Sequence, residues 1–130
     1  MIKETRNALQ ANAADLAASA QFRKRPYVQL GEAPFAGEYD SKNSSYPSVE
    51  SEISWGVGLV LTEIAPGRAN DILTLGFRMG ESCIITGQHW ATDIIAARIM
   101  AAAVLAHMNS DEAFKKLLDE ARKEYDTLKR

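Results

Sequence analysis

Residues 43 to 56, NSSYPSVESEISWG, combine a turn suited to binding an anion with a carboxylate that would oppose it. The turn at Tyr46 to Ser48 leads directly into an expected helix. The first N–H groups of a helix are unpaired and carry partial positive charge, so such a turn favours an anion. Glu50 lies in the first turn of that helix and would repel the same ligand. The segment therefore predicts a polar site near Ser48 and leaves its ligand open.

A second polar group follows at Cys83, His89 and Asp93. If the thiol and imidazole met a carboxylate such as Glu50 in one pocket, they would form a zinc ligand set or a Cys-His-acid nucleophilic arrangement. His89 and Asp93 are one helical turn apart, so they could instead be a polar pair that stabilises a helix start. Cys83 alone is more often a small buried apolar residue. Spacing leaves these alternatives open.

The elements that must position these residues are helical. Apolar residues recur with helical spacing in most of the chain. The sequence predicts an all-α fold, a compact bundle of about five helices, over roughly residues 3–23, 48–65, 69–85, 90–108 and 110–128. Residues 83–86, CIIT, are a weak strand candidate. Residues 27–46 lack periodicity and are expected to form one long loop over the site.

Composition narrows the class of protein further. The 130 residues are 46% hydrophobic and 25% charged, as in an ordinary globular domain, and we expect a single domain over 1–130. The net charge of -2 and the absence of a long basic run argue against nucleic acid as a partner. The polar start and the lack of 18 uninterrupted apolar residues predict no signal core and no membrane partner. The location itself stays unknown.

Three motifs resemble those of the bacterial class A non-specific acid phosphatases, in the type 2 phosphatidic acid phosphatase superfamily. These are Arg25-Pro26, Tyr46-Pro47-Ser48 and SCIITGQHWATD at residues 82–93. The family pattern is Lys-x6-Arg-Pro, then Pro-Ser-Gly-His, then Ser-Arg-x5-His-x3-Asp, and His89 and Asp93 have the expected gaps. The likeness covers nearly all of residues 6–130.

The resemblance implies hydrolysis of phosphomonoesters through a phosphohistidine, with no metal or other cofactor. It places the nucleophile at His89, with Asp93 orienting the ring and the general acid at the position of Glu50. Arg25, Ser48 and the residue at position 83 would bind the phosphate.

Four positions depart from the family pattern. The expected Lys is Ala18, the Gly and His after Ser48 are Val49 and Glu50, and the expected Arg is Cys83. We therefore expect a degenerate or redesigned site with little phosphatase activity, acting as a binding or structural module for phosphate or another small anion. The alternative is an active hydrolase, either a residual phosphatase using His89 or a new activity or metal site built from Glu50, Cys83 and His89.

The resemblance also leads us to expect assembly. The family is periplasmic and carries an additional N-terminal helical region, so the core would expose apolar surface without it. We expect a homodimer through the first helix, at Leu9, and through the fourth, at Ile95 and Ile99.

Overall fold

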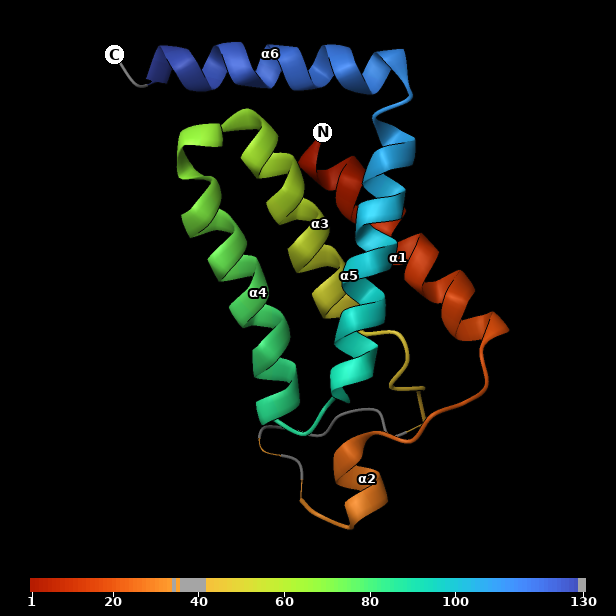
Figure 1. Ribbon diagram of the computed structural model, residues 1–130. Coiled ribbons are helices and arrows are strands. Elements are labelled where there is room, and N and C mark those ends of the chain that lie inside the picture. The colour runs from red at the N-terminus through yellow and green to blue at the C-terminus, as the bar shows by residue number, and fades with distance from the viewer. Residues whose placement is uncertain (34, 36–41, 129–130) are drawn as a thin grey trace.

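The structure is a computed structural model that describes residues 1–33, 35 and 42–128. Within these ranges it contains six α-helices, one short 3-10 helix and no strand, which confirms the all-α prediction (Figure 1). The helices are α1 (Ile2–Ser19), α2 (Pro26–Leu30), α3 (Val49–Ile64), η1 (Pro66–Arg68), α4 (Ala69–Ile85), α5 (Ala91–Met108) and α6 (Glu112–Leu128).

Local signals explain where these helices begin and end. Ser48 is the N-cap of α3, and its side-chain oxygen accepts a hydrogen bond from the N–H of Ser51 at 3.3 Å. Pro66 follows the end of α3 and begins η1. Pro26 occupies the first position of α2, and Gly31, with a φ of 71°, ends it in the left-handed conformation that glycine adopts without strain.

Three boundary predictions were wrong. Part of the expected 27–46 loop is helical, because α2 runs to Leu30. Residues 34 and 36–41 of that loop lie outside the described residues. The first helix ends at Ser19 rather than near residue 23, since Ala20 is already extended. Residues 83–85 of the strand candidate are the last turn of α4.

The core of the bundle is built around α3, which packs against α1, α4 and α5 (Figure 1). A Cβ atom at Gly56 would lie 2.6 Å from Cδ1 of Leu9, so the glycine lets α1 approach α3 closely. Leu9 is consequently buried, and the predicted dimer surface on α1 is wrong at this residue. Ile95 and Ile99 of α5 are exposed.

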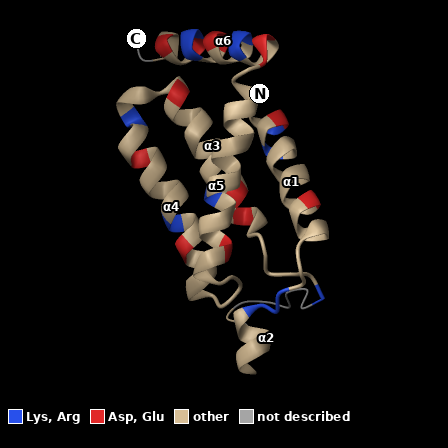
Figure 2. Ribbon diagram, turned by 45° about the vertical axis from the view of Figure 1, so that its right-hand side comes forward, with Lys and Arg blue, Asp and Glu red and all other residues tan. Residues whose placement is uncertain are grey.

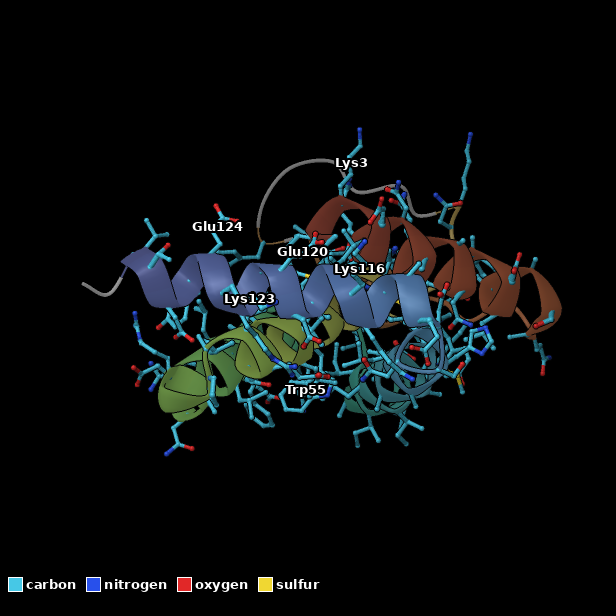
Figure 3. All side chains as sticks on the ribbon, turned by 90° about the horizontal axis from the view of Figure 1, so that it is seen from above. Lys3, Trp55, Lys116, Glu120, Lys123 and Glu124 are labelled. Carbon is cyan, nitrogen blue, oxygen red and sulfur yellow. The ribbon has the colours of Figure 1, made fainter. Side chains whose placement is uncertain are left out.

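Helix α6 lies across one end of the bundle and covers a small apolar cluster. Phe114 and Leu118 pack there with Val60 and Leu105. The other side of α6 is strongly charged, with basic and acidic residues alternating along it (Figure 2). Seen from above, the charged residues labelled on this helix are Lys116, Glu120, Lys123 and Glu124 (Figure 3). The 3.6-residue period of α6 therefore separates a buried stripe from a solvated face.

Helix α5 is long and apolar enough to cross a membrane by length and composition alone, and no other described helix is. A core helix of a bundle meets the same criterion. Here Ile94, Ala97 and Ala101 of α5 are buried, and the helix contacts α1 and α3.

Candidate active site

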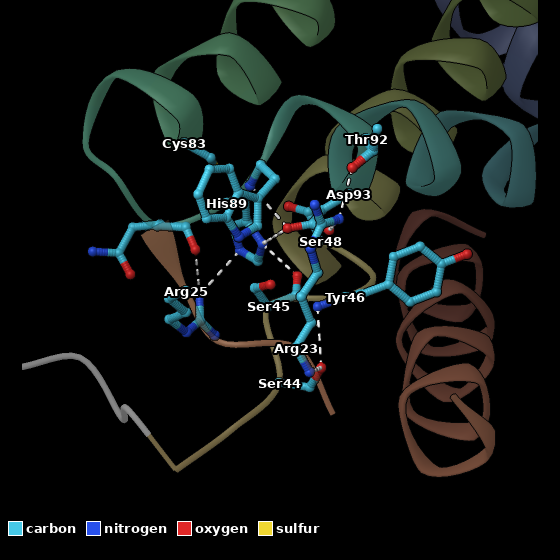
Figure 4. A network of polar contacts seen from close by, with 12 residues as sticks. Arg23, Arg25, Ser44, Ser45, Tyr46, Ser48, Cys83, His89, Thr92 and Asp93 are labelled. Carbon is cyan, nitrogen blue, oxygen red and sulfur yellow. Dashed lines mark hydrogen bonds and ion pairs between the residues drawn. The ribbon is translucent and has the colours of Figure 1, made fainter. Parts of the chain in front are cut away.

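His89 is the centre of the candidate site and lies in the turn between α4 and α5 (Figure 4). The side chain is 2% exposed. Its Nδ1 atom lies 2.7 Å from the carbonyl oxygen of Ser45. Its Nε2 atom lies 3.2 Å from a guanidinium nitrogen of Arg25 and 3.3 Å from Oε2 of Glu50. The structure therefore brings together His89, Arg25 and Glu50, three positions that the family resemblance assigned to the site.

The Ser45 carbonyl selects the tautomer of His89. A carbonyl oxygen only accepts hydrogen bonds, so the N–H of the neutral ring must be at Nδ1. The lone pair is then at Nε2, where Arg25 can donate to it. When the ring is protonated, Nε2 instead donates to Glu50. The neutral form of His89 thus presents a nucleophilic nitrogen between a cation and an anion.

Glu50 and His89 stabilise each other in their charged forms. Hydrogen bonding to His89 lowers the pKa of Glu50 to about 2, although partial burial acts in the opposite direction. Burial alone would lower the pKa of His89, but the carboxylates of Asp93 and Glu50 outweigh burial and raise it. Among the described residues, the ion pair that Glu50 forms is with His89.

Arg25 is held beside His89 by the main chain. The same guanidinium nitrogen that faces His89 donates to the carbonyl oxygen of Gln88 at 3.2 Å. The Nε atom of Arg25 is buried and has no hydrogen-bond partner in the described part of the chain. A buried donor without a partner is unfavourable. Arg25 also lines the cavities beside His89, where its guanidinium could bind an anion.

Asp93 is less directly coupled to His89 than the resemblance implies. Its Oδ2 atom is 3.8 Å from Nδ1 of His89, beyond the length of a hydrogen bond, and accepts the N–H of Trp90 at 2.8 Å. Oδ1 accepts from Arg23 at 2.6 Å. Asp93 therefore caps the start of α5 and adds a negative charge near His89, while Ser45 orients the ring.

Arg23 is the residue of this network that sequence reasoning missed. Its guanidinium contacts Asp93, donates to the hydroxyl of Thr92 at 2.6 Å and lies over the ring of Trp90, 5.4 Å from its centroid. The only signal in the sequence is the basic run RKRP at residues 23–26, which contains three cations and does not distinguish among them.

Two predicted binding residues have local partners instead. Ser48 is buried, and besides capping α3 its hydroxyl donates to Oγ of Ser51 at 2.9 Å. The thiol of Cys83 lies 3.5 Å from the carbonyl oxygen of Met79, one turn earlier in α4. Ser48 is therefore a helix cap, and a phosphate-binding role for it stays a prediction.

The zinc alternative built from Glu50, Cys83 and His89 was wrong for the residues that the structure describes. Among them, no three His, Cys, Asp or Glu side chains are arranged to hold a metal ion. Burial and the nearby Glu50 carboxylate raise the pKa of the Cys83 thiol, whereas a zinc ligand must be a thiolate. The same shift disfavours Cys83 as a nucleophile.

Two cavities adjoin the His89 centre. A larger one, of about 560 Å³, lies between α1 and the start of α3 and is lined in part by Arg25, Glu50 and His89. A smaller one, of about 200 Å³, shares these three residues and also contacts Cys83 and Gln88. The larger volume is within the range of small-molecule sites. Ala18, at the position of the family Lys, lines this cavity and adds no charge to it.

The fold and the site define an all-helical protein with a buried histidine and an arginine beside a cavity of ligand size. The chain belongs to the PAP2 superfamily, whose family model matches residues 11–115. It is 43% identical over 90 residues to a non-specific acid phosphatase of Providencia stuartii, which covers 69% of this chain. It is 40% identical over 106 residues, 78% of the chain, to an acid phosphatase of Zymomonas mobilis.

A non-specific acid phosphatase of Salmonella typhimurium is 34% identical over 105 residues, or 78% of this chain. The matched segments make up 36%, 40% and 42% of the lengths of these three relatives. The chain therefore spans about two fifths of the length of the curated relatives that it matches.

Proposed function

We propose that this chain is a phosphatase-like domain that binds phosphate or a similar small anion and hydrolyses phosphomonoesters poorly. The observation that carries the proposal is the 3.3 Å contact between Oε2 of Glu50 and Nε2 of His89. In the reaction that the resemblance implies, His89 attacks phosphorus, and the contact of Nδ1 with Ser45 makes Nε2 the nitrogen that would attack. Here a carboxylate lies where the phosphoryl group would have to approach.

Glu50 is also unsuited to the first chemical step. Attack by Nε2 forms the N–P bond as the bond from phosphorus to the leaving oxygen breaks, and the alkoxide that departs must gain a proton. A general acid must hold that proton at the working pH. With a pKa of about 2, Glu50 is ionised at any ordinary pH. The second step, attack of water on the phosphohistidine, would still be open to Glu50 as a base.

The residual hydrolase is the second candidate, and the tautomer of His89 favours it. The 2.7 Å contact with Ser45 places a proton on Nδ1, so that in the neutral ring the lone pair needed for attack is on Nε2. Arg25 supplies one positive charge for the transferring phosphoryl group. These two features support a slow reaction that depends on His89.

Turnover of p-nitrophenyl phosphate between pH 5 and 8 separates the two candidates. We expect turnover at least about a thousandfold below that of an intact phosphatase assayed in parallel, because losing even one preorganised donor lowers rates by about 10² to 10³. His89→Ala is the control for contaminating activity. Slow turnover that vanishes in His89→Ala would favour the residual hydrolase, and rates comparable to the intact enzyme would refute the impaired site.

We expect Glu50→Gln to tighten binding of inorganic phosphate roughly three- to tenfold at pH 7. The change removes a negative charge beside the anion and keeps the size of the side chain. The effect is modest because the Glu50 side chain is 68% exposed, so solvent screens the repulsion between its carboxylate and the phosphate. Isothermal titration calorimetry would measure the dissociation constants.

Glu124→Gln on α6 is the matched control, since it makes the same change on the exposed face of another helix (Figure 3). We expect it to leave the dissociation constant unchanged, and Arg25→Met to weaken binding. Unchanged phosphate affinity in both Glu50→Gln and Arg25→Met would show that phosphate does not bind at this centre.

A further inference from the structure

The larger cavity has an apolar wall that the polar centre does not use. Four alanines of α1 line it in two pairs one helical turn apart, Ala13 with Ala17 and Ala14 with Ala18. Alanine carries a single methyl group, so this face of α1 borders the cavity without filling it. The result is an apolar surface of a folded helix that faces about 560 Å³ of open space.

Phe22 extends this wall beyond the end of α1. The chain leaves the helix after Ser19, and Ala20 and Phe22 both line the same cavity. The Phe22 side chain is 54% exposed, although an aromatic ring of this size gains substantially from being buried. An exposed ring at the edge of a cavity is therefore available to pack against an apolar group of a ligand.

The far side of the cavity is polar and charged. Arg25, Glu50 and His89 line it, and Nε of Arg25 is buried without a partner among the described residues. An occupant that satisfied both sides would place an anionic group near Arg25 and an apolar group against α1. Inorganic phosphate satisfies only the polar side.

We propose that Phe22 and the alanine face of α1 determine the specificity of this cavity, by favouring anions that carry an apolar group over bare anions. The inference rests on the proposed anion-binding function and adds the residues that determine which anions are preferred. Phe22 acts on the apolar part of the ligand and leaves the anionic group to Arg25. Removing Phe22 is therefore expected to change selectivity more than affinity for a small anion.

Phenylphosphonate and methylphosphonate are suitable probes because they share one anionic group and differ in the apolar part. We expect the wild-type protein to bind phenylphosphonate roughly tenfold more tightly than methylphosphonate, because partial burial of the phenyl ring stabilises the complex. Phe22→Ser should reduce this preference to about two- to threefold. Phe77→Ser makes the same change at a half-exposed aromatic on α4, outside this cavity, and should preserve the tenfold ratio. Calorimetry on the full chain provides all the constants.

Ala18→Leu gives an independent test at an exposed position of α1, where folding should be unaffected. The larger side chain would fill part of the cavity, so phenylphosphonate should lose affinity and methylphosphonate should not. Equal binding of both phosphonates to the wild type, or an unchanged ratio in Phe22→Ser, would overturn the inference and leave the anion site in place. If Arg25→Met left the binding of both probes unchanged, the proposed function itself would fail.

Discussion

Replacing Arg23 with methionine is expected to reduce the free energy of unfolding by about 3 kcal/mol at pH 7. Asp93 is completely buried, and the guanidinium of Arg23 lies 2.6 Å from its Oδ1 atom. Removing one partner of a buried ion pair leaves an uncompensated charge, which typically costs about 3 to 5 kcal/mol. We expect the lower end of this range because the Arg23 side chain is 38% exposed. Water can therefore reach part of the space that the guanidinium leaves. Urea denaturation monitored by circular dichroism would measure the loss.

The loss should depend on pH. Burial alone would raise the pKa of Asp93, but the imidazole of His89, the N–H of Trp90 and the charge of Arg23 outweigh burial and lower it. A carboxyl group with a lowered pKa contributes stability above its unfolded pKa, near 4, and loses that contribution as the pH falls through its folded pKa. The difference between wild type and Arg23→Met should therefore be full at pH 6 to 7 and shrink in acid.

Arg68→Met is the matched control for this experiment. Arg68 also pairs with an aspartate, Asp71, but both side chains are largely exposed, so the change should alter stability by less than about 1 kcal/mol. If Arg23→Met were as mild as Arg68→Met at pH 7, Asp93 would not depend on Arg23 for its charge. The carboxylate of Asp93 would then be stabilised by His89 and by the N–H of Trp90.

Arg23 also illustrates which parts of this molecule can be predicted from sequence. Four long helices, α3 to α6, lie close to their expected ranges, since caps such as Ser48 and breakers such as Pro66 act over a few residues. Helix α2 was missed because five residues are too few to display a hydrophobic period. The choice of Arg23 as the partner of Asp93 depends on how a segment 70 residues away packs, which no local pattern contains.

The residues of the candidate site could be predicted from the sequence, but the hydrogen bonds between them could not. Family motifs indicated Arg25, Glu50 and His89, and the structure places them within hydrogen-bonding distance of one another through His89. The group that orients the ring is the main-chain carbonyl of Ser45. Every residue has a main-chain carbonyl, so a contact with one cannot be predicted from residue type. Asp93 was predicted to orient the ring because its carboxylate side chain can be recognised in the sequence.

The burial of Glu52 was likewise invisible in the sequence. Glu52 lies in the first turn of α3, where an acidic residue is favourable and usually exposed. It is instead fully buried, and neither of its carboxylate oxygens has a hydrogen-bond partner in the described part of the chain. Gly56, one turn later on the same face, contacts Leu9 of α1. Glu52 therefore lies on the face of α3 that also carries Gly56, and helices α1 and α3 run in opposite directions (Figures 1 and 2).

Within the described ranges, a second buried acceptor without a partner belongs to α1. The Oδ1 atom of Asn12 is also buried without a partner among the described residues. Burial of Glu52 without a hydrogen-bond donor from the described residues disfavours a carboxylate and favours a protonated carboxyl group, which can itself donate a hydrogen bond. Burial raises the pKa of Glu52 from 4.5 to about 7, and no charged group contributes to the shift.

Stability should therefore fall as the pH rises from about 4.5 to 7 through this one residue. The raised pKa belongs to the folded protein, so below pH 4.5 Glu52 is protonated in both states and costs nothing. Between pH 4.5 and 7 the unfolded chain loses its proton first, and the folded state is progressively disfavoured. A shift of this size corresponds to about 3 kcal/mol, reached above pH 7. Glu52→Gln, neutral at every pH, should abolish this slope.

The experiment compares unfolding free energies of wild type, Glu52→Gln and Glu52→Met from pH 4.5 to 8. Asp93 and the other acidic groups remain in all three proteins, so their contributions cancel in the differences. Glu52→Met should be at least as stable as the wild type above pH 7, since replacing a buried charge with an apolar side chain removes the desolvation penalty. Glu120→Gln on the exposed face of α6 is the control and should leave the pH profile unchanged (Figure 3). A constant difference between wild type and Glu52→Gln over this range would mean that Glu52 is ionised in the folded protein. The α1–α3 interface would then have to admit the water that a buried carboxylate needs.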